Sequence, residues 1–88
     1  MTFDLPYAIA QRALADLKSA VYLVLHKGPP EGLRNADIGR LLGIYGGHIG
    51  HEGHIPRTVL ALMEEEGVVQ QDSEKRWTLK THPPQSDT

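Results

Sequence analysis

Apolar residues recur every three or four positions in the first third of the chain, which predicts one long helix from Tyr7 to His26. The stripe expected to face the core consists of Ile9, Ala13, Leu17, Val21 and Leu25. Asp4 is expected to cap the start of this helix. The sequence Gly28-Pro29-Pro30 is expected to end it, because proline cannot continue the helical hydrogen-bond ladder.

Two shorter helices are predicted in the middle of the chain, on either side of a glycine-rich loop at 43–53. The first follows an extended segment at 31–34, with Asn35 as its expected N-cap and Gly43 as its terminator. Its apolar face is expected to consist of Ile38, Leu41 and Leu42. The second covers about 54–66 and ends before Gly67. Its buried stripe is expected to consist of Ile55, Val59, Leu60 and Met63.

The last part of the pattern predicts a β-hairpin. Residues 68–71 and 76–80 are strand-like and flank the polar turn 72–75. Alternation along the second strand places Trp77 and Leu79 toward the core. Residues 81–88 contain Pro83-Pro84 and few apolar side chains, which predicts a disordered tail. The expected organisation is therefore one mostly helical α+β domain over residues 1–80, followed by the tail.

Composition narrows the functional classes. The chain has 88 residues, which is enough for one domain, and it lacks cysteine, so thiolate metal sites, disulfides and a cysteine nucleophile are excluded. The absence of cysteine fits a reducing compartment, and we expect a cytoplasmic protein. No apolar run is long enough to span a bilayer, so no membrane partner is expected. The formal net charge of −2 means that any DNA-binding face must gather its cations locally.

The segment from Gly32 to Lys80 resembles a winged helix-turn-helix domain of the kind found in MarR-type regulators. Three stretches carry the resemblance, namely GLRNADIGRLLGI (32–44), RTVLALMEEEGVVQQD (57–72) and KRWTLK (75–80). The resemblance implies a three-helix fold with a C-terminal two-stranded wing. It also implies binding of double-stranded DNA, as a transcriptional regulator or a DNA-binding accessory protein.

In this family the third helix generally reads bases from the major groove with its N-terminal half. By position, the resemblance implies that His54, Arg57, Thr58 and Ala61 face the groove. Arg57 is the strongest candidate, since arginine can bond both O6 and N7 of guanine. The expected phosphate contacts are Arg34 and Arg40, near the second helix, and Lys75, Arg76 and Lys80 on the wing. The turn of 43–53 is longer than the turn usual in this motif.

The histidines at 48, 51 and 54 stand three positions apart in the glycine-rich loop. Zinc proteases need histidines four apart on one helical face, and sulfur ligands are absent, so no metal site and no cofactor are predicted. His48 and His51 are candidate loop contacts to DNA phosphates, and a solvated loop without function is an equal alternative. If they contact DNA, acidification from pH 8 to 6 should raise its affinity, because histidine gains a proton over this range.

No pairing of nucleophile and base is evident in the sequence, so an enzyme is not expected. The alternative function is a winged helix that binds proteins without touching DNA, since a fold does not determine a function. Apolar residues cover more than one face of the first helix, among them Tyr7, Ala8, Ala10, Leu14 and Tyr22. This surplus predicts a homodimer through that helix.

Overall fold

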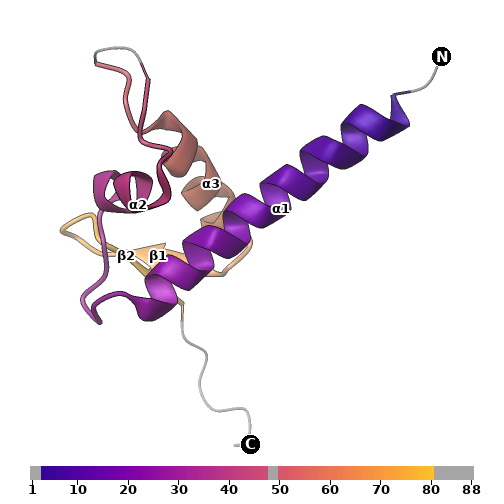
Figure 1. Ribbon diagram of the computed structural model, residues 1–88. Coiled ribbons are helices and arrows are strands. Elements are labelled where there is room, and N and C mark those ends of the chain that lie inside the picture. The colour runs from indigo at the N-terminus through magenta and orange to yellow at the C-terminus, as the bar shows by residue number, and fades with distance from the viewer. Residues whose placement is uncertain (1–2, 48–49, 81–88) are drawn as a thin grey trace, which may run out of the picture.

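The computed structural model describes residues 3–47 and 50–80, and in them three helices precede a two-stranded hairpin (Figure 1). The elements are α1 (Asp4–Lys27), α2 (Asn35–Leu42), α3 (His54–Glu65), β1 (Val69–Gln71) and β2 (Trp77–Leu79). The expected mostly helical α+β class and the order of the elements are confirmed. The predicted tail at 81–88 and the candidate contact His48 lie outside the described residues.

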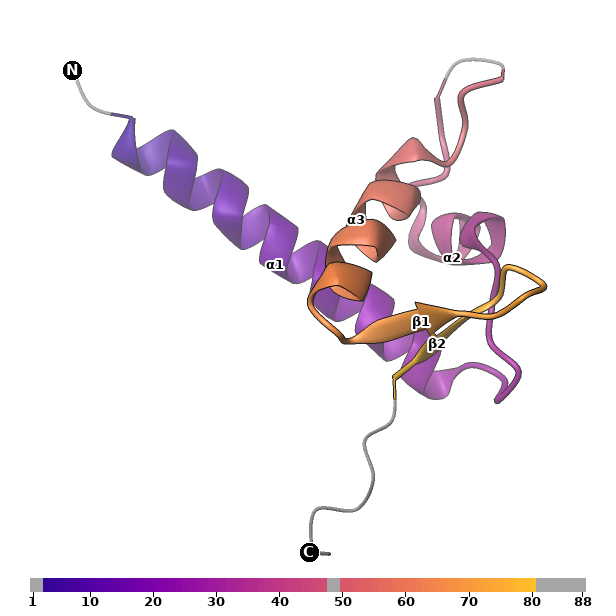
Figure 2. The ribbon, with the colours of Figure 1, turned by 180° about the vertical axis from the view of Figure 1, so that it is seen from behind.

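Helix α1 is longer than predicted and only its second half packs on the core. It begins at Asp4, with Phe3 as the N-cap residue, so the predicted capping by the Asp4 side chain is wrong. Val21 and Leu25 are buried, whereas Ile9 is 60% exposed. The predicted core stripe is therefore wrong in its first half, where Ile9 and Ala13 are exposed. The reason is visible in Figures 1 and 2, in which the N-terminal half of α1 extends beyond the other elements.

Helix α2 begins at Asn35, the residue expected to precede the helix as its N-cap. Arg34 is the N-cap residue and Asn35 is already helical, so the predicted capping by Asn35 is wrong. The Asp37 carboxylate instead accepts a hydrogen bond of 3.3 Å from the Arg34 backbone N–H. Ile38 is fully buried, but Leu41 is 66% exposed, because the core contacts a narrower face than the apolar pattern covers. Gly43 ends the helix in the left-handed conformation, as predicted.

The core lies where the second half of α1, the other two helices and the hairpin meet. It consists of Val21, Leu25, Ile38, Val59, Leu60, Met63, Val69 and Trp77. The predicted burial of Ile55 is wrong, since its side chain is 49% exposed and Pro56 occupies the inner position of that turn. The expected inward orientation of Trp77 is confirmed, and Leu79 packs half-buried against the same core.

The hairpin is antiparallel, with Val69 opposite Leu79 and Gln71 opposite Trp77. Leu33, in the predicted extended segment, forms an additional antiparallel bridge with Trp77. The Trp77 N–H donates to the Leu33 carbonyl at 2.7 Å, and the Leu33 N–H donates to the Trp77 carbonyl at 3.1 Å. This bridge ties the connection between α1 and α2 to β2, so the hairpin has a fixed place beside the helices.

In the described ranges, none of the helices combines the length and the apolar character that a membrane crossing requires.

Candidate nucleic-acid interface

The N-terminal half of α3 presents one side to the core and the other to solvent. Pro56, Val59, Leu60 and Met63 are buried. The four positions that the sequence singled out, namely His54, Arg57, Thr58 and Ala61, are all exposed. Three of them, Arg57, Thr58 and Ala61, line a shallow groove that continues to Leu62, Glu64 and Glu65. The helical period thus places one guanidinium, one hydroxyl and one imidazole on a single accessible surface.

The start of α3 is held in place by contacts that sequence patterns did not indicate. The Asn35 side chain donates a hydrogen bond of 3.1 Å to the Gly53 carbonyl, and the Gly53 N–H donates to the Tyr45 carbonyl at 3.0 Å. Gly53 has φ of 81°, and a Cβ there would lie 2.8 Å from the Asn35 amide nitrogen. A side chain at position 53 would therefore collide with the Asn35 amide group, which bonds to the Gly53 carbonyl.

Tyr45 fills the corner between α2 and α3. Its ring lies about 3.0 Å from the positions that a Cβ on Gly39 or Gly53 would occupy. The Arg40 guanidinium lies over the same ring, 4.6 Å from the centroid, which is within range of a cation–π interaction. The sequence predicted Arg40 as a phosphate contact, and the structure leaves it exposed near the start of α3. The long connection between α2 and α3 is thus closed at its base by Tyr45 and Gly53.

Histidine side chains lie at the same end of α3. The rings of His51 and His54 meet edge to face, with centroids 5.8 Å apart. Within residues 3–47 and 50–80, no group of three histidine, aspartate or glutamate side chains has an arrangement that could hold a metal ion. The imidazoles of His51 and His54 are both exposed.

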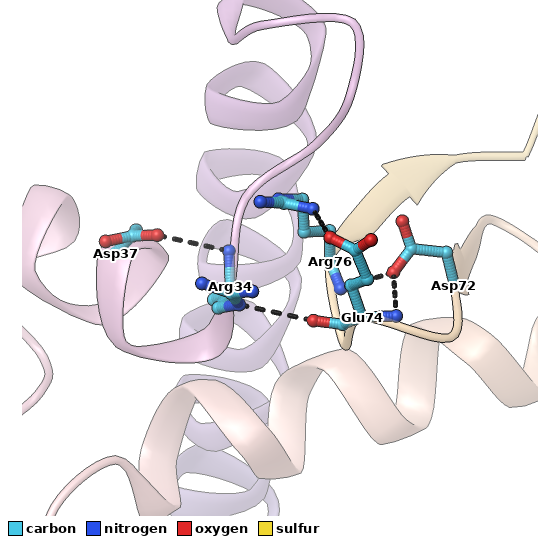
Figure 3. A network of polar contacts seen from close by, with 5 residues as sticks. All are labelled: Arg34, Asp37, Asp72, Glu74 and Arg76. Atoms are coloured by element: carbon cyan, nitrogen blue, oxygen red, sulfur yellow. Dashed lines mark hydrogen bonds and ion pairs between the residues drawn. The ribbon is translucent and has the colours of Figure 1, made fainter.

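The turn of the hairpin is organised by one carboxylate (Figure 3). Asp72 accepts hydrogen bonds from the backbone N–H groups of Arg76, at 2.9 Å, and Glu74, at 2.8 Å. The bond from the Arg76 N–H is the main cause that lowers the pKa of Asp72 below its usual value of 3.8. Lys75 adopts φ of 67° at the tip and is exposed. The hydrogen bonds to Asp72 therefore fix a turn whose tip exposes the cationic side chain of Lys75.

Two of the predicted phosphate contacts are joined through Glu74, as Figure 3 shows. Arg76 forms an ion pair with the Glu74 carboxylate, and the Arg34 Nε donates to the Glu74 carbonyl at 3.2 Å. This brings Arg34 from the start of α2 together with Arg76 from the hairpin turn. Lys80 lies elsewhere, at the base of the hairpin, where its N–H donates to the Val68 carbonyl. The structure therefore gathers Arg34, Lys75 and Arg76 but separates Lys80 from them.

Charge divides α3 into two halves. Its C-terminal end carries the exposed Glu64, Glu65 and Glu66. Of these, Glu66 forms an ion pair with Lys18 of α1, at 2.6 Å. The other two lie exposed at the end of the groove that begins at Arg57. A polyanion would be attracted to the N-terminal half of α3 and repelled from its C-terminal end.

Comparison of the chain with protein-family models, with curated proteins and with solved structures finds no match. The chemistry and arrangement of the side chains therefore carry the functional interpretation.

Proposed function

We propose that this chain is a winged helix-turn-helix domain that binds double-stranded DNA, with the N-terminal half of α3 entering the major groove. The order of helices and hairpin supports the fold assignment. So does the isolated bridge between Leu33 and Trp77, because it pairs the extended segment before the second helix with the second strand of the wing. In this reading α3 is the recognition helix and the turn at 72–76 is the tip of the wing.

The observation that carries the proposal is the exposed side of α3 formed by His54, Arg57 and Thr58. An α-helix fits the major groove of B-DNA, where guanine offers O6 and N7 to a guanidinium. Arg57 supplies that group one turn after the helix begins. Thr58 can donate to or accept from either kind of base pair, and Ala61 can contact a thymine methyl group.

Local charge makes this end of the domain suitable for a polyanion although the whole chain has a net charge of −2. Arg57 and Arg40 lie near the start of α3. Lys75 and Arg34 contribute from the wing tip and the start of α2. Such cations bind phosphates and position the helix, whereas base contacts provide specificity.

The experiment that tests the proposal measures binding to a duplex selected from a random pool, at 50 and 200 mM salt. We expect the affinity of the native chain to fall steeply with salt, because phosphate contacts release counterions. Arg57→Ala should weaken binding to the selected duplex by about 1–3 kcal/mol, the value of a bidentate base contact. Lys27→Ala removes an exposed cation at the C-terminal end of α1 and is the matched control.

Two results would contradict the proposal. One is a chain that binds no duplex at low salt. The other is an equal loss for Arg57→Ala and Lys27→Ala, since uniform losses indicate only diffuse attraction between charges.

A second candidate function, binding of a protein partner, is favoured by an apolar groove between α1 and α2. The groove is lined by Leu23, Val24, Lys27, Gly28, Pro29, Leu33 and Leu41. Leu23 and Leu41 are 52% and 66% exposed, which is high for large apolar side chains. A protein-binding module would show almost no affinity for duplex DNA in the assay above, and this outcome separates the two candidates.

A further inference from the structure

The first half of α1 lies alone in the structure. Residues 3–13 are all exposed, and both views show this part of the helix pointing away from the other elements (Figures 1 and 2). Its exposed side chains include Leu5 at 70% and Ile9 at 60%. Exposure of apolar side chains to water is unfavourable. A helix that exposes so many of them is typical of one that packs against a partner.

One face of α1 carries a regular stripe at alternating steps of four and three residues. The stripe consists of Leu5, Ile9, Arg12, Asp16, Ser19 and Leu23. All of these residues are exposed. Steps of four and three keep residues on one side of a helix, as in coiled coils. The buried Val21 and Leu25 lie on the opposite side, so the stripe faces away from the core of its own domain.

The stripe is complementary to itself when two copies run antiparallel. In one register, Arg12 of each copy faces Asp16 of the other, and this register also places Leu5 against Leu23 and Ile9 against Ser19. Apolar residues then meet at both ends and opposite charges meet in the centre. A parallel pair would place Arg12 against Arg12 and Asp16 against Asp16, which is unfavourable.

We infer that a second copy of this chain covers this face, through an antiparallel two-fold pairing of α1 in which Arg12 of each copy contacts Asp16 of the other. The same patch on both copies forms the interface, as two-fold symmetry requires. From Leu5 to Leu23 the contact runs for roughly 27 Å along the helix. In the described part of the chain, neither Arg12 nor Asp16 takes part in an ion pair within one copy.

The charges in the centre of the interface give a direct test by sedimentation. We expect the native chain to dimerise. Arg12→Asp and Asp16→Arg should each weaken the dimer by roughly tenfold or more, because each places like charges together twice per dimer. The double variant restores opposite charges and should return to within about threefold of the native chain. Both residues are exposed on a helix, and far-UV circular dichroism of each variant verifies that it is folded.

Cysteine pairs test the register and the direction. The chain has no cysteine of its own, so Leu5→Cys combined with Leu23→Cys should give a dimer linked by two disulfides under mild oxidation. Leu5→Cys alone should cross-link poorly, since an antiparallel register separates the two copies of residue 5. Efficient cross-linking of the single variant would indicate parallel helices and overturn the inference. A native chain that is monomeric at 100 µM, or a double charge variant weaker than both single variants, would also overturn it.

Discussion

Addition of one methyl group at Gly32 should disturb the placement of the hairpin more than it would at any other described glycine. Its φ is 94°, a conformation that favours glycine. A Cβ there would lie 2.5 Å from the Trp77 carbonyl oxygen and 2.7 Å from the Thr78 Cγ2. Backbone atoms cannot move aside as a flexible side chain can. Gly32→Ala must therefore push the chain away from β2 and stretch the bridge between Leu33 and Trp77.

The expected cost has two parts. Positive φ costs a residue with a Cβ about 1–2 kcal/mol. The bridge contributes two backbone hydrogen bonds, each worth a net of about 0.5–1.5 kcal/mol. The alanine also restricts the unfolded chain, which offsets about 0.4–1 kcal/mol of the loss. We therefore expect Gly32→Ala to lower the free energy of unfolding by about 2–3 kcal/mol, a large share of the total for a domain of this size.

The matched control is Gly43→Ala. Gly43 has φ of 72°, and no atom lies within 4 Å of a Cβ built on it. Its cost should be conformational only, about 1 kcal/mol. Urea unfolding followed by the fluorescence of Trp77, the only tryptophan, measures both variants at one protein concentration. Equal losses for Gly32→Ala and Gly43→Ala would refute the reasoning, since the steric contact with Trp77 would then contribute nothing.

A further prediction concerns protonation. The pKa of Asp72 is lowered, so its carboxylate favours the folded turn above pH 3.8 and this contribution disappears as the pH falls through the folded pKa. A carboxyl NMR titration should give a midpoint below that of the peptide 70–78, and an equal or higher midpoint would contradict the hydrogen bonds to Asp72.

Much of the fold could be predicted because its signals are local. The period of apolar residues located the helices, Gly43 marked the end of α2, and the alternation around Trp77 identified the inward side of β2. The accessible side of α3 could be predicted in the same way, since burial of Val59 and Met63 determines which residues point outward. These features depend on neighbours a few positions apart.

The errors arose where a distant contact decides the outcome. Ile9 and Leu41 fit the apolar period of their helices, but a period does not tell how far along a helix the core extends. Asn35 is a good capping residue by type, yet its amide bonds to Gly53, eighteen positions later. Tyr45 lies in a loop whose glycines predict irregular structure, and nothing local indicates that its ring packs between α2 and the start of α3.

The proposed DNA contact and the proposed dimer support each other through charge. One copy offers few cations at the start of α3, and the acidic residues 64–66 limit the usable surface to that end. A dimer with a two-fold axis through α1 doubles the cations that face a duplex, and the release of counterions grows with the number of phosphates contacted. In such a dimer the same axis would relate the two copies of α3, so the expected DNA site is an inverted repeat with Arg57 of each copy at one half-site. The projecting half of α1 would then set the distance between half-sites, because the register of Arg12 and Asp16 determines how far apart the two domains lie.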